Sequence, residues 1–186
     1  MDFMDKMTKA DRLLIIGGTG RDSGKSTLAA LLISKFTSRG VTAIKITPHV
    51  HPEMSGLTLI AGKEGFHIYE ERNSVSEKDS SRMLRAGASK VFLIISGEAT
   101  LGEAFTALQP FLTPGTPIIC ESPALRRIVS PDLFILMMHA GINNPDSKNI
   151  DDLIPLADSI FTLNDLDHYK ADIIDLDADN HWHLKY

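Results

Sequence analysis

A glycine-rich segment near the start of the chain carries the residue types that bind a chain of phosphates. Residues 17–27 read GGTGRDSGKST and follow the short apolar run 13–16. A triphosphate needs closely approaching backbone N–H donors, a flexible cation and a hydroxyl that ligates magnesium. Lys25 supplies the cation and Ser26 supplies the hydroxyl. We therefore predict that this loop binds a nucleoside triphosphate, ATP or GTP, together with Mg²⁺.

The predicted phosphate-binding residues are contiguous in the sequence. We expect Lys25 to lie between the β- and γ-phosphates and Ser26 to ligate the metal. The full set comprises Gly20, Arg21, Asp22, Ser23, Gly24, Lys25, Ser26 and Thr27.

One position departs from the usual G-x-x-x-x-G-K-[ST] spacing. Thr19 stands where the first glycine would fall, and Gly18 and Gly20 flank it. Because glycine adopts left-handed backbone angles without steric cost, we expect one of these neighbours to supply the missing conformation. The alternative is a glycine-rich turn without a ligand, but such a turn needs neither Lys25 nor Ser26.

Phosphoryl chemistry also calls for carboxylates that hold magnesium. Glu121 follows the apolar run 117–120, and Asp79 opens a helical pattern. Asp79 suits a helix cap as well as a metal ligand, so both roles stay open. Glu98 also follows an apolar run, but there we favour a solvated residue at the start of a helix.

Histidines suggest a second kind of metal site. His49 and His51 alternate on an extended segment, so their side chains would point the same way, and His67 lies downstream. Without a cysteine or a third closely spaced ligand, exposed loop histidines are the favoured interpretation. The pair His181 and His183 is interpreted in the same way.

The elements that would position these residues form an α/β pattern. Apolar spacing predicts a helix over 25–38, stopped by Gly40, and then a strand over 41–46. Further buried strands are predicted at 91–95, 117–120, 133–138 and 159–162, with helices at 80–86, 101–112 and 151–157. This alternation predicts a three-layer α/β/α P-loop NTPase fold with a mostly parallel sheet, as one domain over residues 1–186.

Two segments fit this pattern less well. Residues 47–73 are predicted to be polar and irregular, beyond the carboxyl end of the second strand, where ligands of such sheets collect. Residues 181–184 are predicted to form either a final edge strand or a docking tail.

Composition limits the classes of partner. The net charge of −5 and the absence of a basic run argue against nucleic acid. No apolar stretch approaches the roughly 20 residues that span a bilayer. The first residues lack a secretory pattern, and the one cysteine, Cys120, has apolar neighbours that predict a buried thiol. We expect a cytoplasmic protein that binds neither nucleic acid nor membrane.

Several segments resemble the MobB family of P-loop nucleotide-binding adaptors in molybdenum-cofactor guanylylation. The resemblance rests on residues 78–82 (KDSSR), residues 85–88 (RAGA) before the strand at 91, and residues 44–51 (IKITPHVH). It implies an accessory role in molybdopterin guanine dinucleotide synthesis with weak or no hydrolysis. The implied partners are a second copy of the chain or a cofactor-biosynthesis enzyme. Ser122 and Pro123 depart from the family pattern, which has a glycine after the glutamate.

The loop at 19–26 and Lys45 are also similar to those of dethiobiotin synthetase. In both families an aspartate at the position of Asp79 and a glutamate at that of Glu121 approach the metal. The resemblance therefore implies Asp79 and Glu121 as metal ligands beside Ser26, and Lys45 as a catalytic residue beside Lys25. A second loop lysine, common in this class, is absent because its position is Gly20.

Two main functional hypotheses follow. The first is a nucleotide-binding accessory protein, and the second is an enzyme in which the nucleotide activates or phosphorylates a small acidic metabolite, with Lys45 and residues 47–73 at the acceptor site. Lys45 discriminates between them, because burial at the carboxyl edge of the sheet supports catalysis and exposure on an edge strand does not. A nucleotide-gated metal chaperone using His49 and His51 is a third hypothesis.

Overall fold

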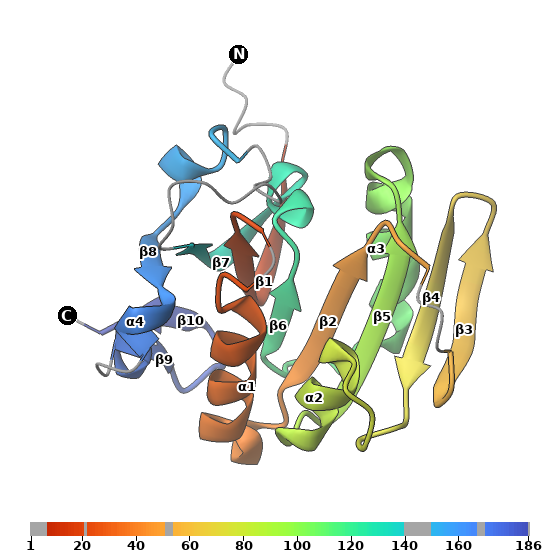
Figure 1. Ribbon diagram of the computed structural model, residues 1–186, viewed down its shortest axis with the longest axis horizontal. Coiled ribbons are helices and arrows are strands. Elements are labelled where there is room, and N and C mark those ends of the chain that lie inside the picture. The colour runs from red at the N-terminus through yellow and green to blue at the C-terminus, as the bar shows by residue number, and fades with distance from the viewer. Residues whose placement is uncertain (1–6, 21, 51–53, 140–149, 167–169, 186) are drawn as a thin grey trace.

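The computed structural model describes residues 7–20, 22–50, 54–139, 150–166 and 170–185. Eight strands form one sheet in the order β3-β4-β5-β2-β6-β1-β7-β8 (Figure 1). They are β1 (Thr8–Gly18), β2 (Thr42–Thr47), β3 (Leu57–Lys63), β4 (Phe66–Glu71), β5 (Lys90–Ser96), β6 (Ile118–Glu121), β7 (Val129–Met138) and β8 (Ser159–Thr162). Pairing is parallel from β5 through β8, and antiparallel where β3 and β4 extend the sheet beyond β5.

Helices cover both faces of the sheet (Figure 1). The α-helices are α1 (Lys25–Lys35), α2 (Asp79–Arg85), α3 (Leu101–Leu108) and α4 (Leu163–Leu166). Short 3₁₀ turns occur at Thr37–Arg39, Glu98–Thr100, Gln109–Phe111, Ala124–Arg127, Ile154–Leu156 and Lys170–Ile173. Among the described residues, no helix combines the length and apolar character needed to cross a bilayer.

The hydrophobic core divides into two layers, one on each side of the sheet. Because successive residues of a strand point to opposite faces, Leu14 and Ile16 of β1 pack in one layer and Leu13 and Ile15 in the other. The first layer includes α1 and α2, and the second includes α3. The predicted three-layer, mostly parallel architecture is therefore confirmed.

Two helix predictions differ from the structure. The helix expected over 25–38 ends at Lys35, and a 3₁₀ turn continues to Gly40, whose φ of 68° is the left-handed stop that was expected. The helix expected over 151–157 is wrong, because only the 3₁₀ turn Ile154–Leu156 forms there. Pro155 lacks the backbone N–H that a longer helix would need.

The prediction that residues 47–73 are irregular is also wrong for most of that segment. Residues 57–71 form a β3–β4 hairpin whose turn uses Gly65 at φ 94°. Phe66 and Ile68 bury their side chains in the core and the residue between them is exposed, which is the period-2 pattern of a strand. The glycines and prolines of this region concealed that alternation.

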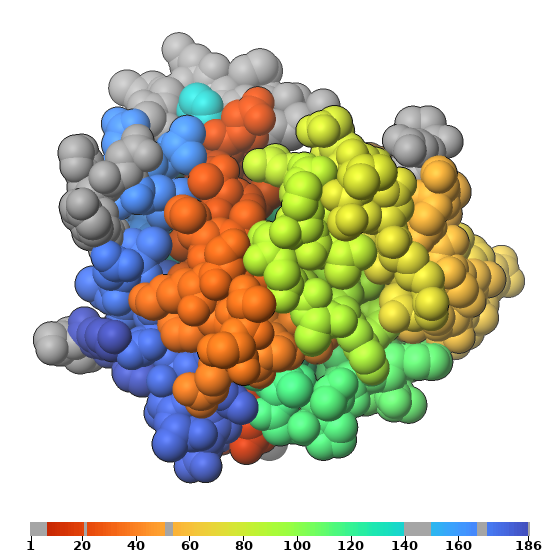
Figure 2. Space-filling model, turned by 90° about the horizontal axis from the view of Figure 1, so that it is seen from below, coloured from red at the N-terminus to blue at the C-terminus, as the bar shows by residue number. Residues whose placement is uncertain are grey.

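The C-terminal residues form a separate two-stranded sheet. β10 (Trp182–Leu184) pairs antiparallel with β9 (Ile174–Leu176), so residues 181–184 are not an edge strand of the main sheet. Trp182 meets Phe36 edge to face, with ring centroids 5.4 Å apart. Lys35 Nζ donates to Ile174 O at 2.8 Å. This small sheet therefore anchors the end of α1, which lies between the C-terminal segment (blue) and α2 (yellow-green) in Figure 2.

Candidate functional site

The glycine-rich loop joins the carboxyl end of β1 to the start of α1. β1 lies inside the sheet between β6 and β7, so its carboxyl end is central. Gly24 is the residue before α1 and has a φ of 92°. The loop therefore presents the first turn of α1, with its N–H groups, at the edge where ligands of such sheets bind.

The backbone angles of the loop exclude Gly18 as the residue that replaces the missing glycine. Among its described residues, left-handed angles occur at Asp22 (φ 57°) and Gly24, and not at Gly18. Aspartate tolerates this conformation better than most residues do. Thr19 instead fastens the loop to β7, because its N–H donates to Met137 O at 3.2 Å and its hydroxyl accepts from His139 N at 3.0 Å.

Lys25 folds over the loop. A Cβ at Gly18 would lie 2.9 Å from Cδ of Lys25 and 2.6 Å from Oγ of Ser23, so only glycine leaves room for both side chains. The ammonium of Lys25 donates to Gly20 O and, at 3.0 Å, to Ser23 Oγ. Ser23 is buried and Thr27 is exposed on α1, whereas Arg21 lies outside the described residues.

A charged cluster lies beside the loop, built from Ser26, Lys45, Asp79 and Glu121. Ser26 Oγ donates to Glu121 Oε2 at 2.9 Å. Lys45 Nζ pairs with Glu121 Oε1 and, at 2.9 Å, with Asp79 Oδ2. The four side chains come from α1, β2, α2 and β6. The structure thus brings together the residues that the sequence singled out for metal binding and catalysis.

Strand register explains why two of these residues meet. Lys45 and Glu121 occupy the same level of the parallel pair β2 and β6. Glu121 is 2% exposed, and the side chain of Lys45 is 16% exposed. Lys45 is therefore largely buried on an interior strand, near the carboxyl end of β2.

The ionisation of the cluster follows from its contacts. Burial disfavours the charged form of Lys45, but the charges of Glu121 and Asp79 and its hydrogen bonds to them outweigh that effect and raise the pKa of Lys45. Burial likewise opposes ionisation of Asp79, but the charge of Lys45 and hydrogen bonds from Lys45 and Ser26 lower the pKa of Asp79. Both groups are therefore held in their charged forms at neutral pH.

Asp79 is not the capping residue of α2. The N-cap is Lys78, with extended angles, and Asp79 is the first residue of the helix. Its carboxylate contacts Lys45 and lies 3.8 Å from Arg82 Nη1. Of the two roles that the sequence left open, the structure does not support the helix cap, and the metal ligand stays a prediction.

Glu98 and Cys120, to which the sequence assigned no role in the site, are not members of this cluster. Glu98 is 80% exposed and pairs with Arg127 at 3.5 Å, as expected for a solvated residue. Burial raises the pKa of the Cys120 thiol well above its ordinary value, in keeping with a buried thiol.

The histidines do not assemble as a loop metal site among the described residues. His49 is exposed, His67 stacks on Tyr69, and His51 lies outside the described residues. Within the described part of the chain, a group with metal-binding side-chain types occurs at Asp11, Asp132 and His181, near the amino end of β1. Asp132 Oδ2 there already accepts hydrogen bonds from Arg12 N and His181.

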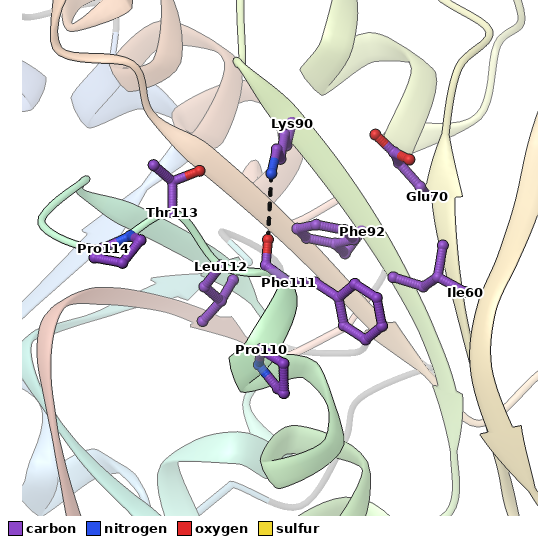
Figure 3. Close-up of a pocket in the computed structure, with 9 residues that line it drawn as sticks. All are labelled: Ile60, Glu70, Lys90, Phe92, Pro110, Phe111, Leu112, Thr113 and Pro114. Carbon is purple, nitrogen blue, oxygen red and sulfur yellow. Dashed lines mark hydrogen bonds between the residues drawn. The ribbon is translucent and has the colours of Figure 1, made fainter.

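A hollow of about 390 Å³ lies away from the charged cluster. It is mainly apolar and includes Ile60, Phe92, Phe111 and Leu112 (Figure 3). Lys90, the first residue of β5, donates to Phe111 O at 3.3 Å there. Because β5 runs parallel to β2, Lys90 lies at the opposite end of the strands from the phosphate loop.

The sequence analysis missed a buried group that involves the two residues flanking Asp79. Glu71 and Ser80 are 2% and 3% exposed, and Lys78 pairs with Glu71. Lys78 and Ser80 flank Asp79 in the segment that carried the family resemblance, but Glu71 belongs to no motif. The alternation in β4 does not indicate its burial either, because Glu71 is out of phase with Phe66 and Ile68.

Comparison with known proteins supports the fold. No family model matches the sequence, and no curated protein matches it either. Among solved structures, the chain is similar to LpxK from Aquifex aeolicus, an "apo" form in complex with ATP, with a TM-score of 0.52 and 16% identity. The match covers 87% of this chain and 51% of that one, so this chain spans about half its length. The chain has the α/β fold of P-loop NTPases.

Proposed function

We propose that this protein binds a magnesium nucleoside triphosphate at residues 20–27 and transfers or hydrolyses its γ-phosphoryl group. The observation that carries this proposal is the direct contact between the loop and the charged cluster, through Ser26 and Glu121. A phosphate loop alone accounts for binding. A buried lysine joined to it through a shared carboxylate adds a group that can act on the transferred phosphoryl.

The residues fit magnesium. Mg²⁺ prefers oxygen ligands and is usually bound through one or two carboxylates together with substrate phosphates. Ser26, Asp79 and Glu121 offer hydroxyl and carboxylate oxygens next to the loop. These residues would hold the ion, which when bound neutralises charge on the phosphates.

Each side chain has a distinct part in this proposal. Lys25 would exchange its bonds to Gly20 O and Ser23 Oγ for phosphate oxygens. The N–H groups of the first turn of α1 would donate to the same phosphates. Lys45, held charged by two carboxylates, would stabilise negative charge on the transferred group or orient an anionic acceptor.

An enzyme is favoured over an accessory protein by the position of Lys45, because a protein that only binds nucleotide needs no buried cation there. An accessory role in molybdenum-cofactor synthesis rests on the MobB resemblance alone. Pairing with a second copy of the chain has the same basis. Light scattering with and without nucleotide tests the pairing.

The nucleotide is tested by thermal unfolding with ATP or GTP, with and without Mg²⁺. The ATP in the LpxK structure makes ATP the first candidate. A ligand that binds only the folded state raises Tm. At a free ligand concentration of a hundred times its Kd, it adds about 2.7 kcal/mol to the free energy of unfolding. We expect a rise with one purine triphosphate that is larger with Mg²⁺. No rise with either nucleotide would contradict the proposal.

Catalysis is tested separately by phosphate release from that nucleotide. We expect Lys45→Met to retain nucleotide binding and to lose the release of phosphate. Equal rates of phosphate release in the variant and the natural protein would contradict the proposed role of Lys45.

A further inference from the structure

A buried ion pair joins Glu71 to Lys78, the residue that precedes Asp79. Glu71 is the last residue of β4, and its side chain has no exposed surface. Lys78 precedes Asp79, and its side chain is only 8% exposed. Lys78 Nζ lies 3.3 Å from Glu71 Oε2. A charge buried this deeply is costly unless it is paired and hydrogen bonded.

Glu71 collects donors from both sides of Asp79. Its Oε2 accepts from Ser80 Oγ at 2.7 Å and contacts Lys78, and its Oε1 accepts from Asn73 N at 2.9 Å. Lys78 and Ser80 are the residues immediately before and after Asp79. A single carboxylate on β4 therefore fixes the chain on both sides of the residue that meets Lys45.

The same group holds the segment that leads into β3. Lys78 Nζ donates to Ser55 O at 2.8 Å, and Arg72 N donates to Gly56 O at 2.8 Å. Gly56 has a φ of 80°, and a Cβ there would lie 2.2 Å from Cβ of Asn73. Residues 55–56 are thus closely attached to the corner that carries Glu71.

We propose that Glu71 and Lys78 are positioning residues that set the affinity of the site for Mg²⁺ by fixing Asp79, and that they couple residues 55–56 to that affinity. This inference rests on the proposed function, because it assumes that Asp79 helps to hold the metal. The loop binds phosphates through residues 20–27, so its affinity for metal-free nucleotide is independent of Glu71. The ion pair between Glu71 and Lys78 therefore affects the Mg²⁺ concentration that nucleotide binding needs.

The test compares Glu71→Gln with the natural protein. In each, ATP binding is measured as Mg²⁺ is added, and the Mg²⁺ concentration that gives half of the full increase in ATP affinity is determined. Changes to residues that orient metal ligands typically cost about 10- to 100-fold in metal affinity. We expect the half-saturating concentration to rise about tenfold or more, with the Kd for ATP in EDTA unchanged. Glu70→Gln is the matched control, because Glu70 is the neighbouring residue and pairs with the exposed Arg72. It should leave both quantities unchanged.

Two further variants separate positioning from general loss of structure. Ser80→Ala removes one hydrogen bond to Glu71 without removing a charge, so it should shift the Mg²⁺ requirement in the same direction by a smaller factor even if Glu71→Gln folds poorly. Lys78→Met combined with Glu71→Gln removes both charges. We expect the double variant to regain Tm relative to Glu71→Gln while its Mg²⁺ requirement stays raised.

The outcomes are distinguishable. If the natural protein binds no nucleotide, the proposed function fails and this inference falls with it. If the natural protein binds ATP with Mg²⁺ and Glu71→Gln and Ser80→Ala match Glu70→Gln, only the positioning role is overturned. An equal loss of affinity with and without Mg²⁺ would also overturn it, because that is the result of a disturbed loop.

Discussion

The phosphate loop and the charged cluster beside it are built in opposite ways. The loop is one stretch of chain, and Gly24, Lys25 and Ser26 act on neighbouring atoms because they are neighbours in sequence. The cluster draws Lys45, Asp79 and Glu121 from three elements that strand order and register bring together. Substitutions in the loop should therefore reduce nucleotide affinity with little other effect. Substitutions in the cluster should reduce both the proposed phosphoryl transfer and the free energy of unfolding.

The largest expected effect is at Lys25. Lys25→Ala removes the cation that would contact the phosphates, and we expect the Kd for magnesium ATP to rise by at least about 100-fold, or about 2.7 kcal/mol. Isothermal titration calorimetry measures this. Lys63→Ala is the control, because Lys63 is an exposed lysine paired with Glu103. Unchanged affinity in Lys25→Ala would contradict a phosphate-binding role for the loop.

Lys45→Met tests the cluster. It leaves the buried Glu121 without its cation, so we expect a loss of about 3 kcal/mol in the free energy of unfolding, measured by urea denaturation. Lys25→Ala should lose far less stability. Equal losses in the two variants would remove the proposed distinction between loop and cluster.

Gly24→Ala tests the backbone of the loop. Its φ of 92° and a Cβ position 3.0 Å from both Met137 Cε and Leu163 Cδ1 predict a loss of about 1–3 kcal/mol. Gly102→Ala is the matched control, because Gly102 lies in α3 with nothing within 4 Å of its Cβ position. There we expect no loss, or a gain of up to about 1 kcal/mol.

The smallest effect concerns pH. The lowered pKa of Asp79 means that its contribution to stability is present above the unfolded value of 3.8 and is lost as pH falls through the folded value. The raised pKa of Lys45 means that its contribution is present below 10.5 and is lost at higher pH. The urea midpoints of Asp79→Asn and the natural protein should therefore differ most between about pH 5 and 9 and converge below about pH 4. A difference that grows on acidification would contradict the pairing.

Much of the fold could be predicted because the parallel strands are continuous apolar runs separated by helices. The hairpin β3–β4 could not, because its exposed, polar positions and glycines obscured the alternation around Phe66 and Ile68. Chain order alone also gives no indication that β2 pairs with β6 rather than with β1.

Parts of the candidate site were likewise predictable from the sequence and parts were not. Residues 20–27 were identifiable because their spacing is local. Asp79 and Glu121 were singled out by their places at a helix start and after an apolar run, and the family resemblance added the metal role. Their contacts with Lys45 depend on how the strands and α2 pack. Glu71 was missed because a buried carboxylate paired across the fold has no local pattern. Arg21 and His51 lie outside the described residues, so their predicted roles stay predictions.

The central claim is tested most directly by a crystal structure with Mg²⁺ and a non-hydrolysable ATP analogue. We predict phosphates against the first turn of α1, with Lys25 Nζ on phosphate oxygens and Mg²⁺ within reach of Ser26 Oγ. A nucleotide bound elsewhere, such as the apolar hollow beside Phe92 and Phe111, would contradict the account.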